Sequence, residues 1–194
     1  DPRQETNASL SRLMIGAEPP QLRHAAAVPG EQVLAVRALS LPRLGAFGAD
    51  LEQVSLEVCR GEILGVAGVS GNGQQELMAA LSGEDVRAPA DAIRLFGQPI
   101  GDHSPRRRRR EGLHFVPEER LGRGAVPSIS LSLNTLLTRT ESVTPFGWIR
   151  LERTADLARH LIARYNVKAG GADATAQSLS GGNLQKFIVG REID

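Results

Sequence analysis

Residues Glu62–Gly83 read EILGVAGVSGNGQQELMAALSG and combine an apolar run, a cluster of glycines and a helix-forming segment. The apolar run at Ile63–Ala67 predicts a buried strand, and Gln74–Leu81 predicts a helix that Ser82-Gly83 closes. Between them, the glycine-rich turn at 68–73 lets backbone N–H groups converge on an anion, and the dipole of the following helix adds to that attraction. The stretch therefore predicts a phosphate-binding loop (P-loop) followed by its helix.

The glycine-rich turn matches only part of the P-loop pattern G-x-x-x-x-G-K-[ST]. Residues 68–73 fit, but Gln74 stands where the pattern has lysine, and Gln75 stands where it has the Mg²⁺-binding serine or threonine. The candidate nucleotide-binding residues are Gly68, Val69, Ser70, Gly71, Asn72, Gly73, Gln74 and Gln75. The loop is a degenerate one, and on this stretch alone an ordinary tight turn between strand and helix is an equal alternative.

A second glycine motif lies roughly a hundred residues further on, where residues 179–186 read LSGGNLQK. By itself, Ser180-Gly181-Gly182 would be a flexible turn that caps a helix. LSGG followed by a polar residue and a glutamine, at this distance after a P-loop, resembles the signature of ATP-binding-cassette (ABC) proteins. The resemblance implies that the signature residues contact ATP; these are Leu179, Ser180, Gly181, Gly182, Asn183 and Gln185.

A third motif refines the resemblance. Leu113–Pro117 predicts a buried strand, and residues 116–120 read VPEER, with two glycines shortly after them. ABC proteins end this strand with a glutamine that meets the metal and moves with the transporter subunit, and Glu118 holds that Q-loop position here. VPEER together with GVSGNGQ at the P-loop resembles the second cassette of the simple-sugar and nucleoside importer ATPases, over residues from about 31 to 194.

This resemblance implies an α/β fold, namely the P-loop NTPase core of an ABC ATPase with an antiparallel β subdomain and a helical subdomain at about 128–181. Residues 1–30 are then the end of a preceding cassette and a linker, and residues 31–194 are a partial nucleotide-binding domain. In the family, the strand with the Walker B aspartate and the catalytic glutamate follows the signature helix, and the sequence ends at Asp194 before it. We therefore expect a fold that is incomplete at its C-terminus, with no catalytic residue in this chain.

Local patterns predict the remaining elements. Alternation of apolar and polar residues predicts strands at Val33–Leu39 and Val54–Val58, and a short strand is expected at Ala92–Phe96. Apolar residues at helical spacing predict a helix at Arg150–Tyr165. The apolar stripe of this helix consists of Leu151, Ala155, Ala158, Leu161, Ile162 and Tyr165.

A run of five arginines, Arg106–Arg110, follows Ser104-Pro105, which predict the N-cap and first residue of a short helix. A helix spreads such a run around its circumference, and no aromatic residues are interleaved to stack on bases. We therefore expect a solvated helix here and no nucleic-acid partner.

The glycine-containing turn at Pro42–Asp50 carries an aromatic residue, Phe47. An aromatic from this turn often stacks on adenine in ABC cassettes. A loop phenylalanine packed on the sheet is an equal alternative, and the sequence leaves both open.

Composition limits the class of protein. The 194 residues carry a net charge of +1, which provides no whole-molecule basic field for nucleic acid. The single cysteine, Cys59, excludes an internal disulfide, and no apolar run has the length of a transmembrane helix. The four histidines share no ligand spacing, so we predict no metal site built from them.

The resemblance also implies a mechanism shared between two cassettes. ABC cassettes bind ATP between two subunits, where the P-loop of one and the LSGG of the other hold the same triphosphate. We expect this chain to donate its signature in trans to the competent site and to be inactive as an ATPase alone, while ATP and Mg²⁺ bind in the full assembly. The implied partners are a second nucleotide-binding domain, fused in the parent protein, and the permease subunits of a sugar or nucleoside importer, at the cytoplasmic face of the inner membrane.

Two other functions remain open at this point. One is an ABC protein that is no transporter and acts on nucleic acid or ribosomes, and the other is a non-enzymatic module that senses nucleotide through its degenerate loop. Long coiled-coil or zinc-binding insertions would favour the first of these, and the sequence shows neither. Co-purification with a permease, with nucleic acid or with tightly held nucleotide separates the three.

Overall fold

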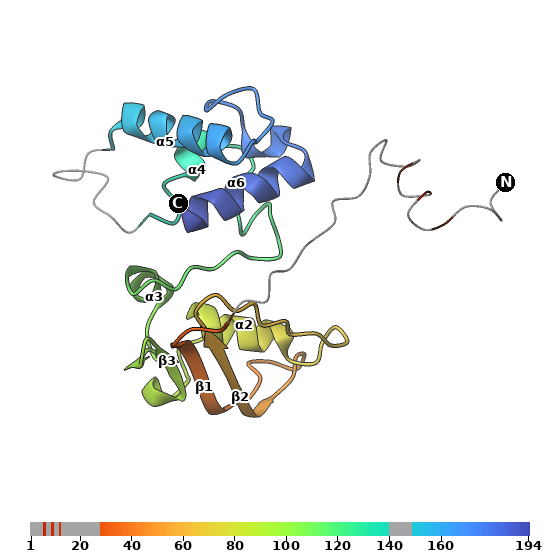
Figure 1. Ribbon diagram of the computed structural model, residues 1–194, viewed down its shortest axis with the longest axis vertical. Helices are drawn as coiled ribbons and strands as arrows, with labels where there is room; N and C mark the ends of the chain where they lie inside the picture. The colour runs from red at the N-terminus through yellow and green to blue at the C-terminus, as the bar shows by residue number, and fades with distance from the viewer. Residues whose placement is uncertain (1–5, 7–8, 10–11, 13–27, 140–148) are drawn as a thin grey trace.

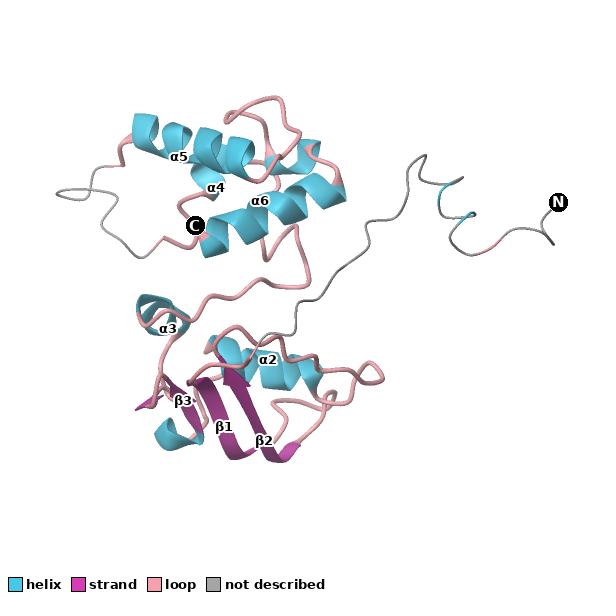
Figure 2. Ribbon diagram, viewed as in Figure 1, coloured by secondary structure: helices cyan, strands magenta, loops and turns pink. Residues whose placement is uncertain are grey.

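The computed structural model describes residues 6, 9, 12, 28–139 and 149–194, so the expected linker at 1–30 lies almost entirely outside the described residues. All strands lie in one part of the molecule and the longest helices lie in the other, as Figures 1 and 2 show. We call residues 28–112 the sheet part, residues 113–124 the connecting segment, and the described residues from 125 onward the helical part. The elements are β1 (Gln32–Leu41), β2 (Leu51–Cys59), α2 (Gln74–Ser82), the 3₁₀ turn η2 (Ala90–Ala92), β3 (Ile93–Leu95), β4 (Gln98–Pro99), α3 (Pro105–Arg110), α4 (Leu131–Asn134), α5 (Leu151–Arg164), the 3₁₀ turn η4 (Ala176–Ser178) and α6 (Gly181–Ile193).

The sheet part is built on an antiparallel sheet with strand order β2-β1-β3-β4. In β1, Ala35 pairs with Glu57 of β2 and with Arg94 of β3, so β1 is a central strand. The strands predicted at 33–39, 54–58 and 92–96 are confirmed.

Helix α2 packs on this sheet through an apolar core. Leu39 of β1 and Ile93 of β3 are fully buried, and Leu77 and Ala80 of α2 belong to the same cluster. The helix begins after Gly73 and ends before Gly83, whose φ angles of 96° and 83° lie in the left-handed region that glycine adopts without strain. The predicted helix and its closing glycine are therefore confirmed.

Two predicted strands are absent from the sheet. Ile63–Ala67 and Leu113–Pro117 have no strand conformation, and the side chain of Ile63 is 97% exposed. A buried strand needs neighbours that pair with its N–H and C=O groups. Because the described strands pair only among themselves, these two predictions, made from apolar content alone, are wrong.

The helical part has its own core. Phe187 and Ile188 of α6 pack against Leu161 of α5, and all three are fully buried. The predicted helix at 150–165 is confirmed as α5, but its stripe begins at Thr154 rather than at Leu151, which is exposed. Ile193, the last residue of α6, is also exposed.

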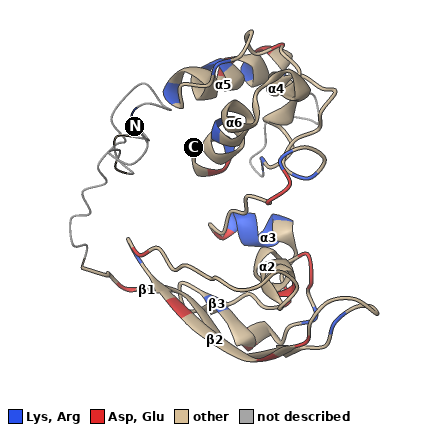
Figure 3. Ribbon diagram, turned by 90° about the vertical axis from the view of Figure 1, so that its right-hand side faces the viewer, with Lys and Arg blue, Asp and Glu red and all other residues tan. Residues whose placement is uncertain are grey.

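Helix α3 differs from the expected solvated helix in one residue. Its bounds match the prediction, and Figure 3 shows its basic residues, but Arg108 is 0% exposed. The Arg108 guanidinium donates hydrogen bonds to backbone carbonyls at the end of α2 and beside α3; these belong to Ala80, Leu81 (2.8 Å), Gly101 (2.7 Å) and His103 (2.8 Å). Burial lowers the pKa of Arg108. The sequence did not distinguish Arg108 from the other four arginines of the run, yet Arg108 attaches α3 to α2.

Charged groups at the end of α6 connect the helical part to the rest of the molecule. Buried Glu192 accepts hydrogen bonds from Arg109 of α3 and from Arg191. Arg191 also donates to the carbonyls of Gly124 (2.9 Å) and Asn134 (3.1 Å). Burial lowers the pKa of Arg191, although the carboxylate of Glu192 partly offsets this effect. We call Arg109, Arg191 and Glu192 the α6 charge cluster.

Replacing Arg108 by methionine tests its role in the fold. We expect Arg108→Met to lower the free energy of unfolding by about 3 kcal/mol or more, because several buried carbonyls lose charge-assisted hydrogen bonds. Urea unfolding measures the change. Arg106→Met is the matched control because Arg106 is exposed on the same helix, and equal losses for the two variants would contradict the assignment.

Candidate functional site

The glycine-rich turn leads directly into the N-terminus of α2, as predicted. Gly71 and Gly73 have φ angles of 88° and 96°, and Gly73 occupies the N-cap position. At these two positions a residue with a Cβ would be strained. The turn therefore has the two left-handed glycines and the following helix that the sequence predicted, although a segment without strand conformation precedes it.

The side chain of Gln74 folds back into this loop. Its Oε1 accepts a hydrogen bond from the Asn72 N–H (3.2 Å), and its Nε2 donates to the Val69 carbonyl (3.1 Å). A Cβ added to Gly68 would lie 2.5 Å from the same Nε2, so the amide lies against that glycine. One of the backbone donors that a phosphate would need is therefore engaged by the protein itself.

The turn between β1 and β2 is attached to α2. The carboxylate of Glu76 accepts a hydrogen bond from the Ala49 N–H (3.2 Å), and a Cβ on Gly48 would lie 2.5 Å from the same carboxylate. This attachment brings Phe47 close to the first turn of α2, with its ring 95% exposed. Phe47 is not buried against the sheet.

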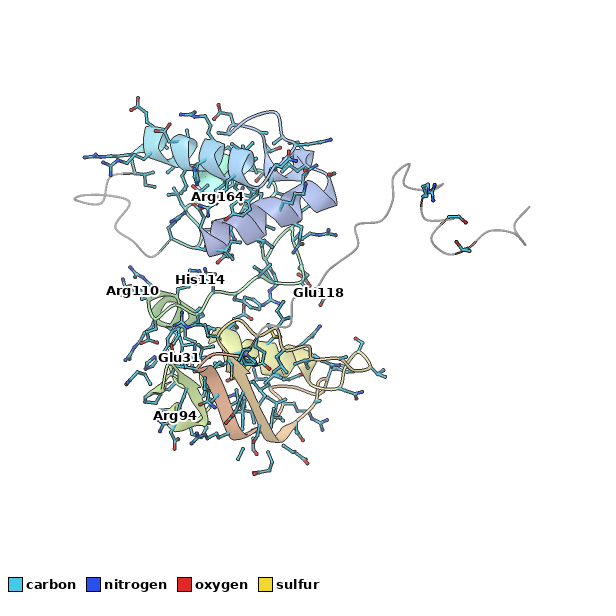
Figure 4. All side chains as sticks on the ribbon, viewed as in Figure 1. Glu31, Arg94, Arg110, His114, Glu118 and Arg164 are labelled. Carbon is cyan, nitrogen blue, oxygen red and sulfur yellow. The ribbon has the colours of Figure 1, made fainter. Side chains whose placement is uncertain are left out.

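A cavity of about 560 Å³ joins several residues that the sequence singled out separately. Phe47, Gln74, Gln75 and Glu118 all line it, so the structure brings together the aromatic candidate, the end of the P-loop and the Q-loop position. Figure 4 shows Glu118 between the sheet part and the helical part. The residues around the cavity are Leu44, Gly45, Phe47, Gln74, Gln75, Glu76, Met78, Ala79, Glu84, Asp85, Arg87, Phe115, Val116, Glu118, Glu119 and Arg123.

Sequence reasoning missed an ion pair at the wall of this cavity. Arg87 donates to Asp85 (2.6 Å) and to the carbonyl of Pro42 (2.9 Å), which links the β1–β2 turn to the segment after α2. The hydrogen bond from Arg87 holds the pKa of Asp85 below its ordinary value, although burial opposes this. The spacing D-x-R carries no recognisable signal in a sequence.

The signature motif forms the N-terminus of α6. Ser180 occupies the N-cap position, and its Oγ accepts a hydrogen bond from the Asn183 side chain (2.9 Å) instead of from the helix backbone. Asn183 in turn accepts from the Lys168 N–H (2.9 Å), which anchors the motif to the preceding loop. Leu179 packs against the helical core, and Gln185 is half-buried. Gly181 and Gly182 are exposed.

The two glycines of the signature have different surroundings. A Cβ on Gly181 would meet the guanidinium of Arg120, whose Nη1 would lie 2.9 Å away. A Cβ on Gly182 would meet nothing within 4 Å. Nothing in the described part of this chain therefore requires residue 182 to be a glycine.

The structure does not bring the P-loop and the signature together. They begin helices that belong to different cores, α2 in the sheet part and α6 in the helical part (Figure 1). Within residues 28–139 and 149–194, no group of three or more His, Cys, Asp or Glu side chains is arranged to hold a metal ion. None of the helices in the described part of the chain has the length and apolarity needed to span a bilayer.

Solved structures share this fold. The chain resembles MJ1267, an ATP-binding cassette of an ABC transporter, with a TM-score of 0.64 and 19% identity over 84% of this chain and 65% of that one. It resembles MJ0796, an ATP-binding cassette in a dimeric post-hydrolysis state bound to ADP and Pi, with a TM-score of 0.63 and 17% identity over 82% and 68% of the two chains. The predicted fold class, an ABC ATPase core with an antiparallel β subdomain and a helical subdomain, is thereby confirmed.

Sequence comparison gives a closer relationship. The chain is 33% identical to the nucleoside import ATP-binding protein NupA of Lactococcus lactis, over 98% of this chain and 38% of the relative. It is 35% identical to the ribose import ATP-binding protein RbsA of Pseudomonas putida, over 98% and 36%. It therefore spans well under half the length of these relatives. The protein-family model for ABC transporters matches residues 51–193, and the chain belongs to the ABC transporter family.

Proposed function

We propose that this chain is part of an importer for simple sugars or nucleosides, and that it donates its LSGG signature to an ATP site completed by a partner cassette while its own P-loop is degenerate. The observation that carries the proposal is the contrast between the two motifs. The signature is intact and exposed at the N-terminus of α6, whereas the P-loop has Gln74 folded into it. The import functions of NupA and RbsA support the choice of substrate class.

The exposed signature is suited to act on a nucleotide held by another subunit. The N-terminus of α6 presents unpaired N–H groups and the positive end of a helix dipole, both of which favour a phosphate. Because nothing in the described chain comes within 4 Å of a Cβ at Gly182, the glycine there leaves room for the close approach of a group from outside. The dimeric cassette structure with ADP and Pi is a precedent within the fold.

The P-loop of this chain is less suited to bind a nucleotide than the signature is. It has no cation at position 74, and the Asn72 N–H is already engaged by the Gln74 side chain. For Mg²⁺, Gln75 offers only an amide oxygen in place of a hydroxyl, and Glu118 is the carboxylate at the Q-loop position of the same cavity. In the full assembly Mg²⁺ would neutralise charge on the phosphates. An adenine at this site would find Phe47 exposed at the cavity, which favours stacking over packing on the sheet.

The assembly that we propose contains two fused cassettes and a permease, located peripherally on the cytoplasmic face of the inner membrane. Residues 31–194 form a partial nucleotide-binding domain in this scheme, with its helical subdomain at about 128–181. The surface from Glu118 to Leu137 has exposed or partly exposed apolar side chains at Leu121, Leu133 and Leu137, where a short permease helix would contact the chain.

Two sets of substitutions in the P-loop show whether ATP binding is weakened by the missing lysine charge or by the Asn72 N–H being engaged by Gln74. We expect Gln74→Lys with Gln75→Ser to tighten ATP binding by about tenfold to a hundredfold, because a charge-assisted hydrogen bond is gained. Gln74→Ala frees the Asn72 N–H without adding charge and should tighten binding less. Equilibrium titration with a fluorescent ATP analogue measures both.

Neither set of changes should produce ATP hydrolysis by the isolated chain, because neither supplies a group that positions the attacking water. A multiple-turnover ATPase activity of the unaltered chain, abolished by a substitution at Gly73, would contradict the assignment of a degenerate site.

Substitution of the signature should damage catalysis without affecting the fold. In the complete two-cassette protein we expect Gly182→Val to lower the ATPase kcat by about 10²–10³-fold, because the added side chain keeps the phosphate away from the backbone donors, and losing one such contact typically costs this much. The melting temperature should stay unchanged because the site has open space. Gly170→Val, in an exposed loop of the same part, is the control. Equal kcat values for the two variants would exclude a role of the signature in trans.

Crosslinking tests the permease contact. A photoreactive crosslinker on Ser128→Cys should capture a cytoplasmic loop of the permease, since Ser128 is exposed and lies within the stretch 118–137. Mass spectrometry identifies the linked peptide. Crosslinks obtained only from cysteines placed at Arg106 or Arg110 would locate the permease elsewhere.

A further inference from the structure

Arg120, in the connecting segment, lies against the first residue of the signature helix. An added Cβ on Gly181 would lie 2.9 Å from Nη1, 3.3 Å from Cζ and 3.5 Å from Nη2 of Arg120. Three of the four heavy atoms of the guanidinium are thus close to the same glycine. The sequence places these two residues 61 positions apart (181 − 120), and only the tertiary structure brings them together.

The loop that carries Arg120 is fastened to α6. The carbonyl of Arg120 accepts a hydrogen bond from the Ala125 N–H (2.8 Å), and the carbonyl of Glu119 accepts from the Gly124 N–H (2.9 Å). The carbonyl of Gly124 also accepts a hydrogen bond from Arg191 of α6 (2.9 Å), and a Cβ added to Gly124 would lie 2.9 Å from Ile188. The position of Arg120 beside the signature is therefore held by the backbone, although its side chain is exposed.

The positive charge of Arg120 lies at a position where the nearby groups do not stabilise it. The N-terminus of α6 carries the positive end of the helix dipole, which repels a cation. Neighbouring arginines have carboxylate partners, since Arg123 pairs with Glu84 (2.6 Å) and Arg191 pairs with Glu192 (3.0 Å). Among the described residues, no carboxylate lies within ion-pair distance of Arg120. Two positive groups therefore meet where an anion would satisfy both.

We propose that Arg120 is a further nucleotide-binding residue of the signature site, whose guanidinium contacts the γ-phosphate of ATP held by the P-loop of the partner cassette. This inference rests on the proposed function in trans. The planar guanidinium offers two parallel N–H donors that match a phosphate, and it would act together with the backbone donors of the signature. The contact would also connect the signature of this chain to the segment after Glu118.

The experiment uses the complete two-cassette importer with its permease in membranes, and it measures ATPase kcat and KM at several salt concentrations. We expect Arg120→Gln to raise the KM for ATP by about tenfold to a hundredfold, the loss typical of a charge-assisted hydrogen bond. It should also make KM less sensitive to salt, because an interaction between charges has been removed. Arg120→Lys should recover part of the loss, since the charge remains but the planar fork does not.

Arg159→Gln is the matched control because Arg159 lies on α5, outside the cavity and the signature, and pairs with Asp156 at the surface (2.6 Å). We expect its KM and salt dependence to equal those of the unaltered importer. The inference would be overturned if Arg120→Gln had the same KM and salt dependence as this control. It would also be overturned if Arg120→Gln lowered only the melting temperature.

A parallel Gly182→Val variant keeps the two hypotheses distinguishable. If Gly182→Val lowers turnover and Arg120→Gln changes nothing, the signature acts in trans without Arg120, and the inference alone is wrong. If neither variant changes turnover or KM, the proposed function of the signature is wrong as well.

Discussion

The α6 charge cluster is the interaction on which the arrangement of this molecule depends. Arg191 is buried at the end of the signature helix, where it donates to the carbonyls of Gly124 and Asn134, and Glu192 beside it binds Arg109 of α3. Removing one partner of such a buried pair leaves an uncompensated charge, which typically costs about 3–5 kcal/mol. The apolar cores on either side are separate, so this cluster links α6 to both the connecting segment and the sheet part.

The cluster matters for function because it lies on the signature helix itself. Through Gly124, Arg191 holds the loop that carries Arg120, and that loop begins directly after Glu118 at the cavity. The segment after Glu118 is therefore connected to α6 by a hydrogen bond as well as by packing. Such a connection suits a protein in which we propose that a permease contact at 118–137 and a nucleotide contact at Arg120 share the same stretch of chain.

The glycine-rich turn before α2, which we propose is a degenerate P-loop, carries a glutamine where the P-loop pattern has lysine. Gly71 and Gly73 adopt left-handed conformations, and α2 begins directly after Gly73. The Gln74 amide supplies both an acceptor for the Asn72 N–H and a donor for the Val69 carbonyl, so the loop satisfies part of its own hydrogen bonding. A lysine could donate to a carbonyl but could not accept from the N–H.

Residue patterns in the sequence by themselves determined α2 with its glycine boundaries, the strands β1 to β3, and the extents of α3 and α5. Resemblance of two glycine motifs to known ones indicated the family. Composition alone could not determine burial. Ile63–Ala67 and Leu113–Pro117 are apolar, yet a strand forms only where neighbours pair with its backbone, and the described sheet offers none there. Likewise, Arg108 is buried among four carbonyls and Arg120 lies on Gly181 because distant segments meet, and no local pattern encodes which side chain faces them.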